Sequence, residues 1–339
     1  MPTAKKLPSG NWRARAVIKN IDGTRSFKSF TAADKKEAEF MALEYENAHN
    51  LENTPDITLE AAARRYIESK RNVTSPSTIR GYQAIIRSYV PELLPRHLKS
   101  ITQEDIQISI NNMAKKYSPK TCRNVHGFIS AVLGAYRPDF TLHTTLPQKI
   151  RHDIYVPDVD EIKHILKLAK GTINEIPIFL AAECGLRASE ISALRTENVK
   201  SDKIIIKEAL VLGDDGEEHL KAPKSWSGYR SIPISETAYN RLISSAENGR
   251  VCPRKAVNIC NNWDKFRKKH GIDERLNFHA LRHHYASKCI LLGIPQKYIA
   301  ELMGHSSTDM IEKVYQHIFP SAMEEYGNLL RQQMDDLED

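Results

Sequence analysis

The segment IIIKEALVLGDDGEEHLKAPKSWSGYRSIPI, residues 204–234, decides the fold class of this 339-residue chain. Its short apolar runs are typical of strands, and GDDG has the composition of a hairpin turn. Helical patterns precede it, at 158–170 and 173–183, and resume after it from Ser235. The sequence therefore predicts a mainly α-helical protein with small β-sheets, an α+β fold. The expected strands are 204–206, 208–212 and 230–234, with the turn at 213–216.

The N-terminal stretch, residues 5–30, alternates as strands do and contains turn residues at 8–10 and 22–23. Within 12–19 the apolar side chains share one face and the basic ones share the other. The apolar set is Trp12, Ala14, Ala16 and Ile18, and the basic set is Arg13, Arg15 and Lys19. Thr31 begins a capping-box-like sequence for a helix to about Asn47. The pattern predicts a three-stranded sheet with one helix, whose basic face either contacts DNA or is simply solvated.

Helical periodicity begins after a polar linker at 50–56. Four helices are expected, each with Ser or Thr at the N-cap and two with Pro at the first helical position. Their caps are Thr58, Ser75, Thr102 and Ser118. The sequence predicts a compact four-helix module that ends near Tyr136.

Positive charge is concentrated in this helical module. The whole chain carries +7, whereas residues 1–50 carry +3, residues 57–150 carry +8 and the tail 321–339 carries −5. Such a distribution is expected of a surface that follows a polyanion. The candidate DNA-facing residues, expected near helix starts where backbone N–H groups favour phosphate, are Arg71, Thr74, Arg80, Lys115, Lys116, Lys120, Thr121 and Arg123. Each of them singly is equally compatible with a solvated helix surface.

Composition excludes several other classes of protein. The sequence has no stretch of about 18 apolar residues, so a membrane-spanning helix is not expected. The N-terminal residues lack the apolar core of a signal peptide, which predicts a cytoplasmic protein. Its five cysteines are scattered without a CxxC pair, which indicates reduced thiols rather than disulfides or a zinc site.

The residues suited to chemistry lie in four separate segments. Arg187 follows Gly185 at a helix junction, and His279 and Arg282 stand three apart on one helix face. Tyr315 has apolar neighbours at helical spacing, so by itself it is as well explained as a structural tyrosine. The segments are AECGLRASE at 182–190, KSWSGYRSIPI at 224–234, HALRHH at 279–284, and LMGH at 302–305 followed by YQH at 315–317.

Taken together, the order G-L-R-x-S-E, hairpin lysine before R-x-I-P, H-x-L-R-H, G-H and Y-x-H resembles the tyrosine recombinase (integrase) family. The resemblance covers 156–320. It implies that Arg187 and Arg282 are the catalytic arginines, that His279 and His305 are the catalytic histidines, and that Tyr315 is the nucleophile. Two further residues follow from it: Lys224 as the hairpin lysine, with Lys221 as the alternative, and Glu190 as the acidic residue that supports Arg187.

These residue types suit the attack on a phosphodiester. Two guanidinium groups present forked donors to the non-bridging oxygens of the phosphorane. A histidine is a suitable general base and the lysine a suitable general acid for the leaving 5′-oxygen. A covalent 3′-phosphotyrosine stores the bond energy, so no cofactor is expected, neither ATP nor a metal. The competing hypothesis is a metal-dependent nuclease built on the histidines, but no Asp, Glu or Cys stands at ligand spacing among them.

The resemblance further implies a site-specific recombinase of a phage or mobile element that passes through a Holliday junction. Expected partners are double-stranded DNA attachment sites, a homotetramer on synapsed DNA, an excisionase and a host DNA-bending protein, with no membrane. The protein is expected in a bacterial cytoplasm, associated with the nucleoid when bound to DNA. The implied domains are an arm-site DNA-binding domain at 1–50, a core-binding domain at 57–147, a catalytic domain at 153–322 and a C-terminal helical tail at 323–339.

Some alternatives stay open. A type IB topoisomerase uses the same nucleophile chemistry without partner exchange, and a non-catalytic DNA-binding module needs only the basic surface. The tail either docks on a neighbouring protomer or is a frayed acidic end.

Overall fold

The computed structural model describes residues 2–19, 24–138, 140–150, 155–222, 228–305, 307–309, 311–312, 314 and 331. It divides into two compact units, Met1–Arg151 and His152–Asp339. No helix in this part of the chain is long and apolar enough to cross a membrane.

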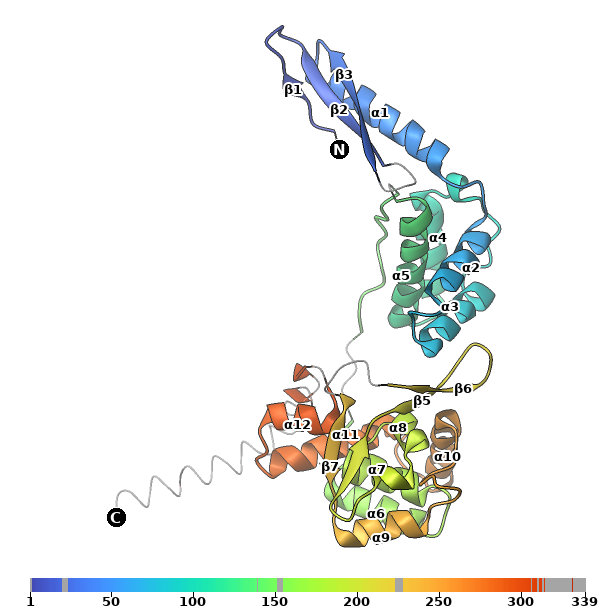
Figure 1. Cartoon of the computed structure of the whole chain (residues 1–339), viewed down its shortest axis with the longest axis vertical. Helices are drawn as coiled ribbons and strands as arrows, with labels where there is room; N and C mark the ends of the chain where they lie inside the picture. Colours follow the sequence, from blue (N-terminus) through green and yellow to red (C-terminus); the bar gives the residue numbers. More distant parts are fainter. Residues whose placement is uncertain are drawn as a thin grey trace. The chain divides into compact units, whose positions relative to one another are not determined.

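The first unit begins with an antiparallel sheet of three strands in the order β1-β2-β3, covered on one face by a helix (Figure 1). The elements are β1 (Lys5–Lys6), β2 (Trp12–Lys19), β3 (Arg25–Ala32) and α1 (Lys35–Asn53). Ala14 and Ala16 are fully buried on β2, as are Ala38 and Ala42 on α1. These small side chains let the helix lie close to the sheet. The predicted division of β2 into an apolar and a basic face is confirmed for residues 12–18.

Helix α1 is longer than the sequence pattern predicted. It continues to Asn53 instead of ending near Asn47, so the expected polar linker at 50–56 is helical for half its length. No Gly or Pro occurs between the start of α1 at Lys35 and Pro55. The helix therefore stops only where proline disfavours helical backbone in the residue before it.

The rest of the first unit contains four helices and a short 3₁₀ turn. They are α2 (Leu59–Lys70), α3 (Pro76–Ser88), η1 (Leu98–Ser100), α4 (Gln103–Ala114) and α5 (Pro119–Tyr136). All four predicted starts are confirmed. The side chains of Thr58, Thr102 and Ser118 accept hydrogen bonds from backbone N–H groups of the first turn, whereas the Ser75 side chain does not cap α3. A continuous core of Ile, Leu, Val and Phe side chains holds the helices together.

The chain after α5 is bound along α4 by two glutamines. The Gln103 side chain donates to the carbonyl of Thr141 at 2.5 Å and accepts from the N–H of His143 at 3.1 Å. One turn later the Gln107 side chain donates to the carbonyl of Thr145 at 3.1 Å and accepts from its N–H at 2.8 Å. The two side-chain amides thus replace a neighbouring strand for this extended segment.

The second unit has the predicted α+β character. Its helices are α6 (Val159–Ala169), α7 (Glu175–Cys184), α8 (Ala188–Ala193), α9 (Glu236–Ser244), α10 (Ala256–Lys269), α11 (Phe278–Leu291) and α12 (Gln296–Met303). Its strands are β4 (Lys203–Ile206), β5 (Ala209–Leu212), β6 (Glu218–Lys221) and β7 (Arg230–Pro233). Strands β5 and β6 form the expected hairpin, and β4 pairs with β7, both antiparallel.

Helices α7 and α11 pack against each other at the centre of this unit (Figure 1). Apolar side chains surround α7 on nearly all sides, which is expected of a helix buried in a core. Trp263 of α10 is 1% exposed, and its indole N–H donates to the carbonyl of Leu276 at 2.9 Å. The ends of α7, α11 and α12 come together, and this meeting point positions the candidate site.

Candidate active site

Gly185 makes the turn that presents Arg187. It ends α7 with a φ of +67°, and a Cβ built at this residue would lie 2.5 Å from Cδ1 of Tyr285. Both the left-handed backbone and the close packing of the tyrosine ring require glycine. After this turn Arg187 becomes the N-cap residue of α8.

The Arg187 side chain is one-third exposed, and its guanidinium is held from two sides. Its Nη1 donates to Oε1 of Glu190 at 2.8 Å, and its Nη2 donates to the carbonyl of Gly304 at 2.9 Å. The backbone N–H of Arg187 donates to Oε2 of Glu190 at 2.8 Å. Glu190 therefore orients both the backbone and the side chain of Arg187.

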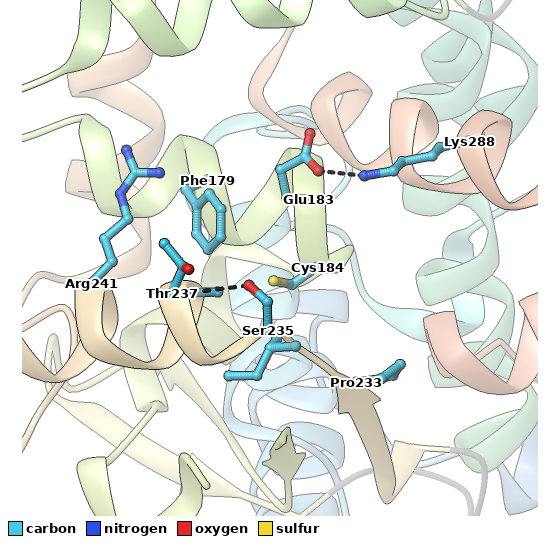
Figure 2. A pocket seen from close by; sticks show the side chains of 10 residues that line it. Phe179, Glu183, Cys184, Pro233, Ser235, Thr237, Arg241 and Lys288 are labelled. Atoms are coloured by element: carbon cyan, nitrogen blue, oxygen red, sulfur yellow. Dashed lines mark hydrogen bonds and ion pairs between the residues drawn. The ribbon is translucent and has the colours of Figure 1, made fainter. Parts of the chain in front are cut away.

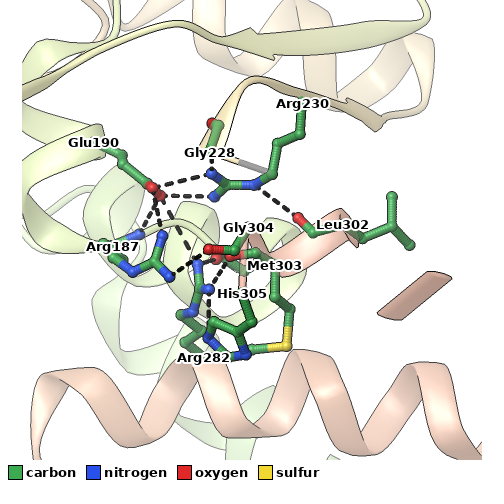
Figure 3. Close-up of polar contacts among 10 residues, drawn as sticks. Arg187, Glu190, Gly228, Arg230, Arg282, Leu302, Met303, Gly304 and His305 are labelled. Atoms are coloured by element: carbon green, nitrogen blue, oxygen red, sulfur yellow. Dashed lines mark hydrogen bonds and ion pairs between the residues drawn. The ribbon is translucent and has the colours of Figure 1, made fainter. Parts of the chain in front are cut away.

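Glu190 is the buried centre of the cluster, with 6% of its surface exposed. Nη1 of Arg230 donates to its Oε1 at 3.0 Å, and Nη2 of Arg230 donates to its Oε2 at 2.7 Å. Nη1 of Arg282 lies 3.8 Å from the same Oε2 (Figure 3). Burial raises the pKa of Glu190, but the hydrogen bonds from Arg230 and the charges of Arg230, Arg282 and Arg187 outweigh it and lower the pKa to about 2. The carboxylate is ionised at neutral pH.

Arg282 comes from α11 and is 1% exposed. It donates from Nη1 to the carbonyl of Gly185 and from Nη2 to the carbonyl of Met303. Its Nη2 also lies 2.9 Å from Nε2 of His305. Arg282 thus links the turn that presents Arg187 to the residue after α12.

Three arginines meet the last turn of α12, whose final carbonyls have no partner within the helix. Arg230 donates from Nε to Leu302 at 2.7 Å, while Arg282 and Arg187 bind the next two carbonyls, of Met303 and Gly304 (Figure 3). Cationic side chains are favourable at this negative end of a helix. Gly304 then turns the chain with a φ of +63° and brings His305 beside Arg282.

The two predicted histidines have strongly lowered pKa values. Partial burial and the charges of Arg282 and Arg187 lower the pKa of His279 to about 4 and that of His305 to about 3. Both imidazoles are therefore neutral at pH 7 in the DNA-free protein. His283 lies edge-on to His279 with ring centroids 5.3 Å apart.

Two predicted catalytic residues, Lys224 and Tyr315, lie outside the described residues. Lys221, the alternative to Lys224, ends β6 opposite Ala209. Val314, the residue before Tyr315, is fully buried in the core of the second unit. The structure thus brings together Arg187, Glu190, His279, Arg282 and His305.

Arg230 belongs to the same cluster but was not predicted. The sequence contained a signal for it, because Arg230 is the arginine of the R-x-I-P motif that helped to identify the hairpin. It alternates with the apolar residues Ile232 and Ile234 along the expected strand, so strand alternation marked position 230 as inward-facing. A buried arginine needs a carboxylate partner, and Glu190 is that partner.

The candidate DNA-binding residues are only partly placed as expected. Arg13 and Arg15 are exposed on the uncovered face of β2, while the side chain of Lys19 lies outside the described residues. In the helical module Arg80, Lys115, Lys116 and Lys120 are exposed, and Thr74 and Thr121 are half-buried.

Three of the helical candidates need correction. Arg71 lies at the C-terminal end of α2 rather than at a helix start, and its Nε pairs with Glu68 at 2.9 Å. Arg123 is half-buried, and its Nη2 donates to the carbonyl of Pro147 at 2.7 Å. Both guanidinium groups already bind acceptors within the chain. Lys115 likewise follows the end of α4.

A pocket of about 310 Å³ lies between α7, α9 and α11 and contains none of the predicted site residues (Figure 2). Its charged side chains are paired: Lys288 binds Glu183 at 2.6 Å, and Arg241 binds Glu175 at 2.6 Å. We assign no function to it.

Within the described ranges, no three His, Cys, Asp or Glu side chains gather as a metal site requires.

Two family models and a relative of known family match the sequence of this chain. Residues 156–321 match the model of the phage integrase family, and residues 58–114 match that of the phage integrase N-terminal SAM-like domain. The chain is 26% identical to the tyrosine recombinase XerC-like protein of Caldanaerobacter subterraneus, over 86% of this chain and 88% of that protein.

Two solved structures share the fold. A fragment of the Tn1549 transposon integrase in complex with transposon right end DNA superposes with a TM-score of 0.66 at 20% identity, covering 81% of this chain and all of that one. The lambda integrase tetramer bound to a Holliday junction gives 0.59 at 16% identity, covering 91% and 97%. With both family models and the arginine cluster in agreement, the chain belongs to the phage integrase family of tyrosine recombinases and is a site-specific DNA recombinase.

Proposed function

We propose that Tyr315 is the nucleophile of this recombinase and that it cleaves a DNA strand by forming a 3′-phosphotyrosine bond. The observation that carries the proposal is the convergence of Arg187, Arg282 and His305, contributed by segments up to 118 residues apart, around one buried carboxylate. Val314 supports it, because its burial in the same core ties the chain to this unit immediately before Tyr315.

The arginines would stabilise the transition state. As the phenolic oxygen approaches phosphorus, negative charge grows on the two non-bridging oxygens. The guanidinium groups of Arg187 and Arg282 offer forked N–H donors to this charge. Loss of one such donor costs roughly 3–4 kcal/mol in a comparable site.

Histidine and lysine side chains transfer the two protons of the cleavage step. The tyrosine proton passes to His279 or His305, each of which has a ring nitrogen with a free lone pair because both imidazoles are neutral at pH 7 in the DNA-free protein. The bond from phosphorus to the 5′-oxygen breaks, and Lys224 protonates that oxygen, with Lys221 as the alternative donor. A second 5′-hydroxyl then attacks the phosphotyrosine and restores the tyrosine. Neither ATP nor a metal enters this scheme.

The complete reaction would exchange one strand pair, form a Holliday junction, and then exchange the second pair. The lambda integrase tetramer on a Holliday junction supports four protomers for this chain. The substrates would be attachment sites of a phage or mobile element, with an excisionase and a host DNA-bending protein as helpers. We place the protein in the cytoplasm, with the nucleoid while it is bound to DNA.

The other parts of the chain would hold the DNA. We assign residues 1–50 to arm sites, 57–147 to the core site, 153–322 to catalysis and 323–339 to a helical tail. Arg13, Arg15, Arg80 and Lys120 are exposed cations available for phosphate contacts. Each contact contributes roughly −0.9 to the slope of log K against log salt, so affinity for duplex DNA should fall steeply as salt is raised.

A nicked suicide substrate that carries candidate attachment sites tests the proposal. The wild-type protein should form a covalent protein–DNA band, and Tyr315→Phe should bind the same duplex without forming it. Tyr298→Phe is the matched control, because Tyr298 is exposed on α12, and this variant should behave as wild type. A covalent band from Tyr315→Phe would overturn the assignment.

The same assay separates the alternatives. Activity lost on addition of EDTA would indicate a metal-dependent nuclease. Relaxation of supercoiled plasmid without recombinant product would indicate a topoisomerase. Binding without any covalent band in wild type would indicate a non-catalytic module.

A further inference from the structure

Arg230 is the first residue of β7 and is 7% exposed. All three of its guanidinium nitrogens are engaged: Nη1 and Nη2 bind the two carboxylate oxygens of Glu190, and Nε binds the carbonyl of Leu302. It therefore joins three segments of the second unit, which are β7, α8 and the last turn of α12 (Figure 3).

Stability alone is a poor explanation for this buried pair. Removing two charges from water costs several kcal/mol per ion, and well-packed apolar side chains commonly stabilise as much or more. The pair instead restricts orientation. Because two nitrogens bind two oxygens, the carboxylate of Glu190 cannot rotate, and the same carboxylate binds the backbone N–H and Nη1 of Arg187.

The hydrogen bond from Nε of Arg230 to the carbonyl of Leu302 acts on α12. Leu302 lies three residues before His305, and the carbonyls between them bind Arg282 and Arg187. Fixing Leu302 therefore fixes the end of α12 and the residue that follows its glycine turn. In this way one side chain determines the positions of two predicted catalytic groups that come from different segments.

We propose that Arg230 is a positioning residue for strand cleavage, which holds Arg187 through Glu190 and holds His305 through the last turn of α12. It does not itself contact the phosphate. The inference rests on the proposed roles of Arg187 and His305.

Loss of the Arg230 charge has a predictable pH effect. The cations facing Glu190 are Arg187, Arg230 and Arg282, and those near His305 are the same three. The imidazole of His279 also faces His305. Without Arg230, the pKa of Glu190 and that of His305 both rise, because each is lowered by its positive charge. Protonation of the cluster then begins at higher pH, so the acid side of the rate profile moves upward.

The test compares Arg230→Met and Arg230→Lys with Arg241→Met. Arg241 is the matched control, because it pairs with Glu175 through two nitrogens at 3.0 and 2.6 Å in the same unit but lines the pocket of Figure 2. For each variant the single-turnover rate of covalent complex formation is measured between about pH 5 and pH 8, together with duplex affinity.

Arg230→Met should form the covalent complex about 100-fold more slowly, as expected when a catalytic group is misplaced. Its duplex affinity should stay within about threefold of wild type, and its rate should begin to fall at a higher pH than that of wild type. Arg230→Lys keeps the charge but loses the paired hydrogen bonds, so its rate should fall with a smaller pH shift. Arg241→Met should retain the wild-type rate and pH profile.

A wild-type rate and pH profile in Arg230→Met would overturn the inference, as would an equal loss in Arg241→Met. If Arg230→Met does not fold, Arg230→Lys decides, and failure of both to fold assigns Arg230 to stability and rejects a positioning role. A wild-type protein that forms no covalent complex rejects the proposed function instead, so the two failures are distinguishable.

Discussion

The helical module and the arginine cluster satisfy their polar groups in opposite ways. In the module, the caps of α2, α4 and α5 bind backbone N–H groups three residues away. In the cluster, Arg187 binds the carbonyl of Gly304, 117 residues away, and Arg282 binds that of Gly185, 97 residues away. The caps depend on neighbours in sequence, whereas the cluster exists only after the unit has folded.

This difference predicts how each region responds to substitution. A local cap contributes about 1 kcal/mol and acts on its own helix. A member of a buried network is coupled to all the others, so its loss leaves charges without partners and costs more. We therefore expect large effects on catalysis and folding from the cluster, and small, separable effects from the module.

Arg187→Lys should produce the largest effect. Lysine keeps the charge but cannot reach Glu190 and Gly304 together with a planar fork. Single-turnover cleavage should fall about 100- to 1,000-fold, equivalent to roughly 3–4 kcal/mol of transition-state stabilisation, with little change in duplex affinity. Arg195→Lys, at a half-exposed arginine 4.0 Å from Glu208, is the control and should stay near wild type. Equal losses of cleavage rate in both variants would show that an arginine of the cluster matters no more for catalysis than one outside it.

Gly185→Ala should come next, through stability. Alanine in a left-handed conformation costs about 1 kcal/mol, and here its Cβ would also overlap the Tyr285 ring. We expect a total loss of about 2–3 kcal/mol in chemical denaturation of the second unit. Gly171→Ala is the matched control, because Gly171 has a φ of +74° with nothing within 4 Å of the added Cβ, so it should lose only the backbone part. Equal losses of unfolding free energy in the two variants would mean that the Tyr285 ring moves aside at no cost in stability.

The sequence predicted what local rules determine. The caps Thr58, Ser75, Thr102 and Ser118 stand at the observed helix starts, and the alternation within 12–19 matches the buried face of β2. The end of α1 was predicted too early because polar residues alone do not stop a helix, whereas proline does.

The sequence could not predict contacts that depend on distant segments. Arg230 was part of a recognised motif, yet its partner Glu190 is 40 residues away and no local pattern connects them. Arg123 was expected to face DNA, but the chain returns after α5 and offers it the carbonyl of Pro147. Arg187, Glu190 and Arg282 were identified through the family resemblance, and the structure supplies the carbonyls that hold the two arginines.

Ser118→Ala tests whether caps in the module act locally. Ser118 caps α5 with a hydrogen bond to the N–H of Thr121 at 3.2 Å, so its loss should destabilise the first unit by about 1 kcal/mol. Ser75→Ala is closely matched, because Ser75 also precedes a proline at the first helical position but does not cap α3. It should lose only a few tenths of a kcal/mol. Thermal and urea unfolding measure both, and the same loss in each would reject the cap as the cause.

Gln107→Ala should have the smallest effect, and it tests where the comparison stops holding. Gln107 binds backbone 38 residues away, so the module also contains distant contacts, and those of Gln107 lie at its surface and involve no charge. Loss of one such pair should speed exchange of the Thr145 amide hydrogen about two- to tenfold. The His143 amide is bound by Gln103 and serves as the internal control. If exchange of both amide hydrogens becomes faster, the segment after α5 opens as one unit, and the module is as coupled as the arginine cluster. If only exchange of the Thr145 amide becomes faster, each glutamine acts alone, and the contrast between the two regions stands.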